Sequence, residues 1–466
     1  METLKDDLED YEQFVGIEEF STNTPPIGGK IKKSIADFVV REITETGEIL
    51  STYEKKEPIR PFNPREHNYT LFTLIKKNTD TIHAAKILMK YLSVSRNDLT
   101  WAGIKDNTAI TAQKFSVKGN YIQSLQNFSH KNITISDIRP SKKKMIALGS
   151  LWGNRFAINI RELLEPYDQM RSIVHKWTTQ VNETGFPNYF GLQRFGQHRP
   201  NSHTLGKLIF QDNYKRACEE FLYKTYPREY ESIKRFRKEA EKRKDYNWII
   251  RNCPKGLSYE KMIFRQLQKD PENYKRAFFA LPRSLVNLIM SSFQSYIFNK
   301  SVSFRMKKGD PIHRPIKGDI VAVLLEKKGN TSLIRYKYHG GDCWNDHIIE
   351  KAFNHERAAV LAPIVGHKTR LDTYSSFSHV LRELFEEENF ELSDYKHKFS
   401  GLFTFRGTFR PINRKPVKTS FHEAHVVGNY PEEDPNGVHL EFSLTKGTYA
   451  TMLLRELMKR SQIEKK

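Results

Sequence analysis

The chain has 466 residues, of which 38% are hydrophobic and 12% aromatic, so it is long enough for about two or three globular domains and too apolar to be disordered throughout. Its formal net charge of +21 favours a polyanionic partner, because neutralised phosphates release counterions, although a basic surface that serves only solubility would give the same number. No apolar run reaches the roughly 18 residues of a membrane span, and the N-terminus lacks a basic-then-apolar leader, which predicts a cytoplasmic protein without a membrane partner.

Strand-like and helix-like segments alternate over the first 198 residues. Residues 1–23 predict a short helix and an extended arm. The helix expected over Asp80–Leu92 opens on a capping aspartate and repeats apolar residues at helical spacing, with Ile82 and Met89 on its buried face. We expect this part of the chain to be an α+β unit with a mixed, mostly antiparallel sheet and flanking helices. The other predicted elements are strands over Phe38–Ile43, Tyr69–Ile75, Ile133–Ile138, Met145–Leu148 and Phe156–Ile160, and a helix over Tyr167–Glu183.

Helical spacing dominates from Pro200 to about residue 300. Arg228–Lys244 is so rich in charge that a solvated helix face is its default interpretation, and contact with an RNA backbone is the sharper alternative. Ser284–Phe304 predicts a core helix that is polar at Gln294 and Asn299. The remaining elements of this region are strands over Asp319–Leu325 and Ser332–Tyr338 and a helix near 376–387.

The end of the chain returns to strand-like alternation. Ala424–Val427 and Val438–Leu444 predict a hairpin across the turn-rich residues 430–437, and Tyr449–Lys459 predicts a closing helix. A sheet-rich start, a helical middle and a sheet-rich end indicate one domain that is interrupted by another. We expect a discontinuous domain over 1–198 and 412–466, with an inserted α+β domain over 199–411.

One carboxylate, Asp106, occupies a short turn between two strand-like runs. It lies in the segment Trp101-Ala-Gly-Ile-Lys-Asp-Asn-Thr-Ala-Ile-Thr-Ala-Gln113, directly after Lys105. An aspartate in such a turn is usually a turn former, because its side chain bonds nearby backbone N–H groups. From this segment alone, a catalytic role is the less common interpretation.

The same segment is similar to the A-G-x-K-D-x-x-A-x-T-x-Q signature of the TruD family of tRNA pseudouridine synthases. Further segments resemble the family's motifs in the family's order, so the resemblance extends over 13–458. Two departures, Ser34-Ile-Ala36 where the family usually has Pro-Glu and Thr445 where proline is common, put the local backbone in doubt. The resembling segments are Gly28–Lys32 with Asp37–Glu42, Gly149–Phe156, Pro187–Gly196, Leu281–Arg283 with Ser292–Asn299, and Phe442–Glu456.

The resemblance implies that Asp106 is the single catalytic carboxylate and that Lys32, in the first motif, is its partner. A carboxylate in a dry pocket stays charged only beside a cation, although without the resemblance Lys32 would be one more surface lysine. Lys105 competes for the same role, but neighbours on an extended chain usually point to opposite sides. We assign Lys105 and Arg194 to RNA binding or to support of the site.

Asn154 and Phe156 are two residues apart in a strand-like segment and therefore project to the same face. In a member of this family the amide would recognise the uracil and the ring would stack on it, while ordinary core packing is the alternative for Phe156. Tyr449 is the expected second aromatic wall. Arg194 lies in a segment dense in aromatics and glycines, and it would bind a phosphate or a structural carboxylate, or belong to a packing hub.

The resemblance implies an enzyme that isomerises a uridine, chiefly at position 13 of tRNA, after flipping the base out of its stack. The reaction needs no metal and no cofactor, and neither the spacing of His422 and His425 nor that of the three cysteines predicts a metal site. A catalytically silent RNA-binding protein or tRNA chaperone is the alternative, and a methyltransferase has no support because no G-x-G-x-x-G loop follows a strand. We expect a monomer whose partner is tRNA.

Overall fold

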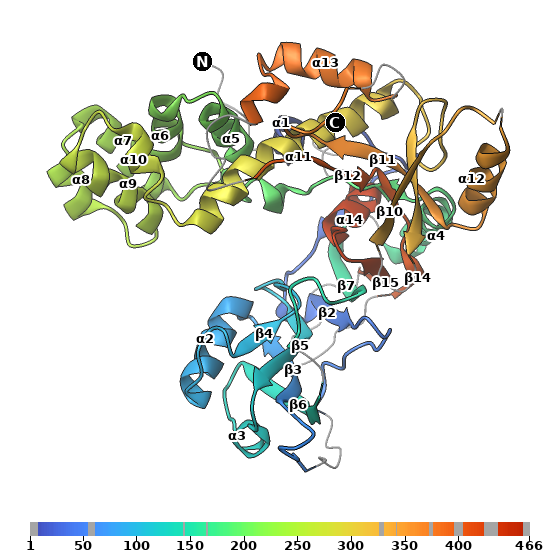
Figure 1. The fold of residues 1–466 in the computed structure, drawn as a ribbon, viewed down its shortest axis with the longest axis horizontal. Helices are drawn as coiled ribbons and strands as arrows, with labels where there is room; N and C mark the ends of the chain where they lie inside the picture. Colours follow the sequence, from blue (N-terminus) through green and yellow to red (C-terminus); the bar gives the residue numbers. More distant parts are fainter. Residues whose placement is uncertain are drawn as a thin grey trace.

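The structure is a computed structural model, and it describes residues 8–54, 61–142, 145–164, 166–325, 330–341, 343–371, 376–395, 404–423 and 437–459. Figure 1 shows a mixed α+β molecule with one large sheet, a smaller sheet and a helical end that extends away from both. The α+β prediction with a mostly antiparallel sheet and flanking helices is confirmed. No helix in the described part of the chain is both long and apolar enough to cross a bilayer.

The large sheet has the strand order β14-β15-β7-β2-β5-β3-β6, with β1 beside β7 and β4 beside β5. All of its pairs are antiparallel except β2 with β5. Early and late segments of the chain therefore share one sheet, because β15 pairs with β7 from Val438 opposite Ile160 to Thr445 opposite Gly153. The strands are β1 (Gly28–Lys30), β2 (Phe38–Ile43), β3 (Tyr69–Lys77), β4 (Leu99–Trp101), β5 (Ile110–Lys118), β6 (Ile133–Ser141), β7 (Gly153–Leu163), β14 (Val417–Glu423) and β15 (Val438–Thr445).

Helices flank this sheet, and α2 (Thr81–Leu92) begins where the sequence predicts it. The carboxylate of Asp80 accepts the backbone N–H groups of Ile82 (2.8 Å) and His83 (3.0 Å), which caps the first turn. The predicted buried face is wrong in one position, since Ile82 is 44% exposed and Ala84 lies buried instead. The other helices of this part are α1 (Leu8–Phe14), α3 (Ile122–Gln126), α4 (Tyr167–Thr184) and α14 (Ala450–Met458).

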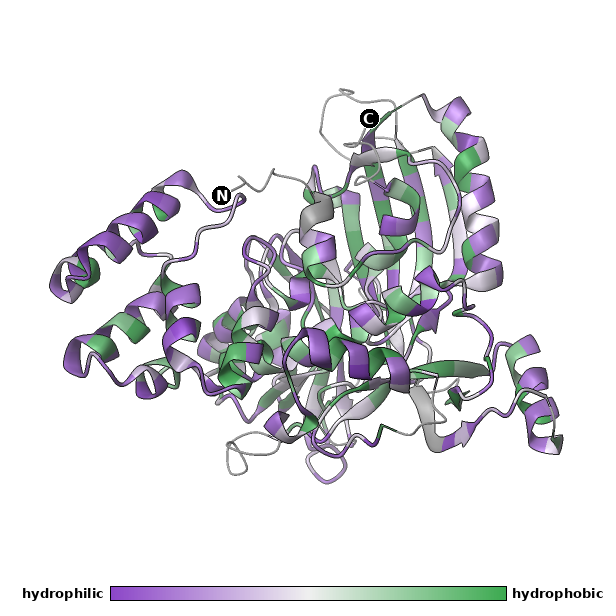
Figure 2. Cartoon of the chain, turned by 90° about the horizontal axis from the view of Figure 1, so that it is seen from above, coloured by the Kyte–Doolittle hydropathy of each residue, from purple (hydrophilic) through white to green (hydrophobic). Residues whose placement is uncertain are grey.

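The middle of the chain forms a helical end and a four-stranded sheet of order β10-β9-β11-β12. The helices α6 to α10 stand apart at one end of the molecule in Figure 1, and Figure 2 shows mostly hydrophilic residues on the helices there, with narrow hydrophobic stripes. The elements are α5 (Ser202–Phe210), α6 (Tyr214–Leu222), α7 (Glu231–Arg243), α8 (Tyr246–Asn252), α9 (Ser258–Lys269), α10 (Tyr274–Phe278), α11 (Arg283–Lys307), β9 (Ile320–Leu325), β10 (Asn330–Lys337), α12 (Trp344–Asn354), β11 (Ala358–Ile364), α13 (Ser378–Glu387) and β12 (Thr408–Pro411), and β8 (Phe186–Pro187) pairs with β13 (Asn413–Arg414).

The long helix α11 joins the middle region to the rest of the molecule through its buried polar residues. Asn299 is fully buried, and its amide nitrogen donates to the carbonyl oxygens of Val15 and Phe190, both at 3.0 Å. Its amide oxygen accepts the N–H of Phe190 at 2.8 Å. The amide of Gln294 donates to the carbonyl of Val365. The polar positions predicted in this helix are therefore anchors for three distant segments.

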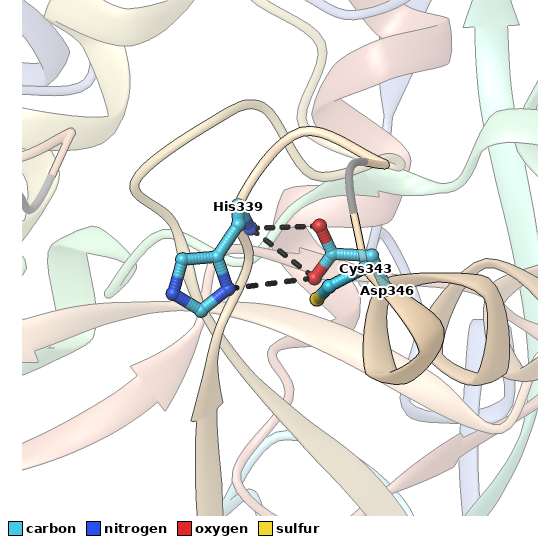
Figure 3. A group of neighbouring side chains, drawn as sticks. All are labelled: His339, Cys343 and Asp346. Carbon is cyan, nitrogen blue, oxygen red and sulfur yellow. Dashed lines mark hydrogen bonds and ion pairs between the residues drawn. The ribbon is translucent and has the colours of Figure 1, made fainter.

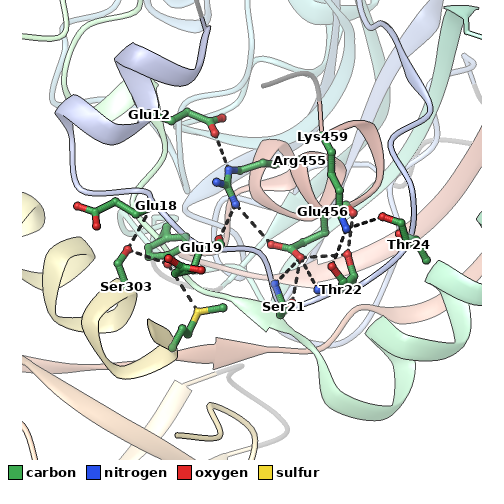
Figure 4. A network of polar contacts seen from close by, with 12 residues as sticks. Glu12, Glu18, Glu19, Ser21, Thr22, Thr24, Ser303, Arg455, Glu456 and Lys459 are labelled. Atoms are coloured by element: carbon green, nitrogen blue, oxygen red, sulfur yellow. Dashed lines mark hydrogen bonds and ion pairs between the residues drawn. The ribbon is translucent and has the colours of Figure 1, made fainter. Parts of the chain in front are cut away.

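An N-terminal arm, residues 15–24, runs along α14 and α11 (Figure 4). Arg455 donates to the Glu12 carboxylate at 2.6 Å, and the carboxylate of Glu456 accepts the backbone N–H groups of Ser21 (2.8 Å) and Thr22 (3.0 Å). The hydroxyl of Ser303 on α11 donates to the carbonyl of residue 16 at 2.8 Å. The arm thus binds the first, middle and last parts of the chain together.

Two predicted segments differ from the structure or lie outside it. Met145–Leu148 is not a strand, because the backbone N–H of Ile146 bonds the hydroxyl of Ser116 (3.0 Å) and holds this segment as a connection between β6 and β7. Ala424–Val427 and most of the predicted turn at 430–437 lie outside the described residues. The strand that pairs with β15 among the described residues is β14, which ends at Glu423, ahead of the predicted first strand of the hairpin.

Candidate active site

The Asp106 loop joins β4 to β5, and hydrogen bonds from buried polar side chains hold its backbone in place. The ammonium of Lys76, on β3, donates to the carbonyl oxygen of Asp106 at 2.6 Å. The amide of Gln113 donates to the carbonyl of Gly103 at 2.9 Å, and the hydroxyl of Thr81 accepts the N–H of Lys105 at 3.1 Å. Burial lowers the pKa of Lys76 to about 8. These bonds fix the loop's backbone and leave the Asp106 carboxylate at its surface.

The carboxylate of Asp106 forms an ion pair with Lys32, whose Nζ lies 2.7 Å from Oδ1. The two side chains are 30% and 25% exposed, so the pair borders solvent without being fully hydrated. Lys32 adopts a left-handed backbone with φ of 61°, which is uncommon for a residue other than glycine. Its ammonium also lies 4.2 Å from the ring centre of Phe38. Of the two lysines considered from the sequence, Lys32 is the one in contact with Asp106.

Lys105 turns its side chain to the other side of the loop. Its Nζ lies 2.9 Å from the carboxylate of Glu42 as an ion pair and donates to Oδ1 of Asn154 at 2.7 Å. Glu42 is fully buried and stands opposite Asn154 in the pairing of β2 with β7. Sequence reasoning missed Glu42, although a glutamate in the apolar strand Phe38–Ile43 is the signal that would have found it. Lys105 therefore links a buried acid to the Asn154 amide.

Phe156 lies on the same face of β7 as Asn154, but it is only 5% exposed. Its ring stacks on Phe442 with centroids 5.3 Å apart and meets the edge of Phe38 at 6.2 Å. Since the Lys32 ammonium lies over that same Phe38 ring, Phe156 belongs to the aromatic floor beneath the ion pair. The packing found here is the core arrangement that the sequence left open as an alternative.

Tyr449 and Arg194 lie together at a second place, around the ring of Phe190. Tyr449, the half-buried residue before α14, meets Phe190 edge-on with centroids 6.4 Å apart. Arg194 donates to the hydroxyls of Ser291 (2.8 Å) and Ser295 (3.2 Å) on α11. Both residues therefore contact Phe190, and Arg194 also bonds α11, whereas Lys32, Lys105 and Asn154 gather around the Asp106 loop.

Among the residues that the structure describes, one group has the donor atoms for a metal ion: His339, Cys343 and Asp346, with ligand atoms within 4.8 Å of one another (Figure 3). The fully buried carboxylate of Asp346 already accepts the backbone N–H groups of His339 (3.0 Å) and Gly341 (2.8 Å) and the hydroxyl of Tyr336 (3.0 Å). These bonds close the turn that leads into α12. The group is thus explained by the closure of the loop before α12.

The fold that carries the paired carboxylate is shared with a known protein. The crystal structure of the putative tRNA pseudouridine synthase D from Methanosarcina mazei superposes with a TM-score of 0.77, at 28% identity over 97% of this chain and 98% of that one. The fold is therefore that of a pseudouridine synthase. A family model described as tRNA pseudouridine synthase D (TruD) matches residues 14–457, and the chain belongs to this family.

Two relatives are similar to this chain over nearly their whole lengths. The probable tRNA pseudouridine synthase D of Methanococcoides burtonii is 31% identical over 96% of this chain and 97% of its own length. The protein of the same name from Archaeoglobus fulgidus is 30% identical over 96% of this chain and 99% of its own. The predicted family is confirmed along nearly the whole sequence, including the helical middle region.

Proposed function

We propose that this protein isomerises a uridine of tRNA, at position 13, to pseudouridine and that Asp106 is its catalytic carboxylate. The observation that carries the proposal is the Lys32–Asp106 ion pair of 2.7 Å on a loop held rigidly from below. Membership of the tRNA pseudouridine synthase D family supplies the reaction and the substrate class. A silent RNA-binding protein would have no use for a partly desolvated, preorganised carboxylate of this kind.

The reaction breaks the bond between N1 of uracil and C1′ of ribose and forms a bond between C5 and C1′. C5 releases its hydrogen to water as a proton, and N1 takes up a proton. The composition of the nucleotide is unchanged, and the reaction uses no oxidant, metal or cofactor. One charged carboxylate beside the reacting sugar and base is enough. The role proposed for Lys32 is to keep Asp106 charged when the nucleotide displaces water from the site.

The flipped uracil is proposed to contact Asn154, Phe156 and Tyr449. The contact of Lys105 with Oδ1 of Asn154 supports an orientation in which the amide N–H₂ group faces the base, where it can donate to a uracil carbonyl. Phe156 would support the base from the aromatic floor, and Tyr449 would close the pocket when the RNA is bound. We further propose a discontinuous catalytic domain over 1–198 and 412–466, an inserted domain over 199–411, and a monomer.

The test uses tRNA transcripts with tritium at C5 of uridine, incubated with the purified protein without added metal or cofactor. We expect tritium release and one pseudouridine per tRNA, and loss of both when position 13 carries cytidine. Asp106→Asn should abolish turnover while it retains tRNA affinity. The absence of product from the wild-type protein would support the silent RNA-binding alternative, and full turnover by D106N would remove Asp106 from the mechanism.

A further inference from the structure

Two arginine side chains lie over the ring of Phe190. The guanidinium of Arg410, on β12, is 4.2 Å from the ring centre, and that of Arg194 is 5.8 Å from it. Tyr449 contacts the same ring. The three residues around Phe190 come from segments far apart in the chain, and all are half-buried where these segments meet.

Every polar contact of these two arginines is to a neutral oxygen. Arg194 donates to the two serine hydroxyls of α11. Arg410 donates to the backbone and side-chain oxygens of Asn188 (3.1 and 2.8 Å) and to the carbonyl of Gly447 (2.8 Å). Among the residues that the structure describes, neither guanidinium has a carboxylate partner.

The most deeply buried arginines of the described chain are paired with acids. Arg305 meets Asp319 at 2.7 Å, Arg161 meets Asp37 at 2.9 Å, and Arg455 meets Glu12 at 2.6 Å. A cation taken out of water without a counter-charge is unfavourable, so pairing is the expected arrangement. The Arg194–Arg410 pair lacks the carboxylate that these three arginines have.

Repulsion between neighbouring arginines adds to the cost of leaving these side chains without an acid. Burial lowers the pKa of Arg410 to about 9, with Tyr449 raising it and the charges of Arg414 and Arg194 lowering it further. Burial also lowers the pKa of Arg194, and it lowers that of Arg414 to about 10. In addition, the buried Nε of Arg414 has no hydrogen-bond partner in the described part of the chain. An anion bound here would offset both the burial and the repulsion.

The arginines are joined directly to the candidate active site. Gly447, which accepts from Arg410, follows β15 by two residues, and β15 places Leu444 opposite Asn154 and Thr445 opposite Gly153. A ligand held by Arg410 would therefore lie at the continuation of the strand that borders the proposed uracil pocket. The site has the chemistry for a phosphodiester, since guanidinium groups bind phosphate oxygens through paired hydrogen bonds.

We propose that Arg194 and Arg410 together bind one backbone phosphate of the substrate RNA, beside the nucleotide that is flipped into the pocket. The inference rests on the proposed function for the identity of the RNA. Both guanidinium groups contact the ring of Phe190, at 4.2 and 5.8 Å from its centre, and this ring brings the two cations to the same place in the fold. The site would hold the RNA backbone at the point where it turns to release its base.

The experiment measures tRNA binding over a range of salt concentrations for wild type, Arg194→Gln, Arg410→Gln and the double variant. Because one phosphate is shared, the slope of log K against log salt should fall by about one ion in each single variant and by no more in the double variant. Affinity should fall about tenfold at low salt. Arg305→Gln, a buried arginine that has a carboxylate partner, is the matched control and should leave the slope unchanged.

A second measurement identifies the phosphate and guards against misfolding. A D-arm RNA with single neutral methylphosphonate linkages should lose affinity for wild type at one position near the target uridine and lose none at that position for R194Q. R194Q serves here because Arg194 bonds only two hydroxyls, so the variant stays folded even if R410Q does not. Unchanged salt slopes, or no methylphosphonate position that depends on Arg194, would overturn the proposal. Failure of the proposed function can be told apart from failure of the phosphate site, because the wild-type protein would then give no pseudouridine, whatever the salt dependence of its tRNA binding.

Discussion

Lys76 offers the sharpest test of how the Asp106 loop is held. Its side chain is fully buried, and its ammonium donates to the carbonyl of Asp106 at 2.6 Å. Burial lowers its pKa from 10.5 to about 8, although the carboxylates of Asp106 and Asp80 raise it. This difference corresponds to about 3 kcal/mol by which folding is disfavoured while Lys76 is charged.

The sign of the pH dependence follows from these two values. Below pH 8 Lys76 is protonated in the folded and the unfolded chain, so the full unfavourable contribution is present. From pH 8 to 10.5 the folded chain releases the proton first, and the free energy of unfolding rises with pH. Lys76→Met removes this titration together with the contacts of the ammonium with the carbonyl oxygens of Asp106 (2.6 Å) and Lys105 (3.5 Å). At neutral pH the variant loses an unfavourable buried charge as well as favourable hydrogen bonds, so we expect the free energy of unfolding of K76M to be within about 2 kcal/mol of the wild-type value. As the pH approaches 10.5 the wild-type protein gains stability and K76M does not, so K76M should become about 3 kcal/mol less stable relative to wild type than it is at neutral pH.

Urea unfolding at neutral and at alkaline pH measures this difference. The matched control is Lys77→Met, which changes the exposed neighbour on the same strand and should show no such pH dependence. Turnover of tRNA by K76M should fall about tenfold at neutral pH, because the loop carbonyls lose their donor. A stability difference between K76M and wild type that is the same at both pH values would refute the reasoning, since Lys76 would then not be a buried cation.

Other variants test the remaining parts of the site. Lys32→Met removes the cation 2.7 Å from Asp106, and we expect kcat to fall about 100- to 1,000-fold with little change in tRNA affinity; a loss of affinity alone would make Lys32 an RNA contact. Glu42→Gln should lower the single-turnover rate about tenfold, and this effect should disappear when Asn154 is already replaced by alanine. Additive losses would show that Glu42 does not act through Asn154. Glutamine at three exposed basic positions of α7, Arg235, Lys238 and Lys242, should weaken tRNA binding and flatten its salt dependence in a filter-binding assay. An unchanged slope would leave α7 a solvated surface.

The sequence predicted the site residues that lie in local motifs. It did not predict the residues whose roles depend on how the strands pair. Lys32 could be proposed as the partner of Asp106 because both lie in segments that resemble the family. Glu42 and Lys76 could not, since their roles arise only when β2 meets β7 and when β3 passes beneath the loop. The sequence around a single charged residue in an apolar strand does not indicate which residue of another segment it will contact.

The fold shows the same division. Strand and helix periods predicted most elements of the large sheet, because one buried face imposes a regular pattern on each strand. Met145–Leu148 has the composition of a strand but is held by the hydroxyl of Ser116 on β5, a bond between segments that the pattern of either one does not contain. Arg410 went unnoticed for a similar reason, because its meeting with Arg194 over Phe190 follows from tertiary packing.

The contact of the N-terminal arm with α14 has a consequence for how the molecule is made. Ribosomal synthesis releases β2, β5 and β7 long before β15 and α14, and the arm's partners Arg455 and Glu456 belong to α14. The half of the large sheet that borders Asn154 therefore stays open on one edge until synthesis is nearly finished, while the middle region already has its own sheet and helices to pack. The nascent protein should therefore fold its middle region before it completes the sheet that borders the candidate active site.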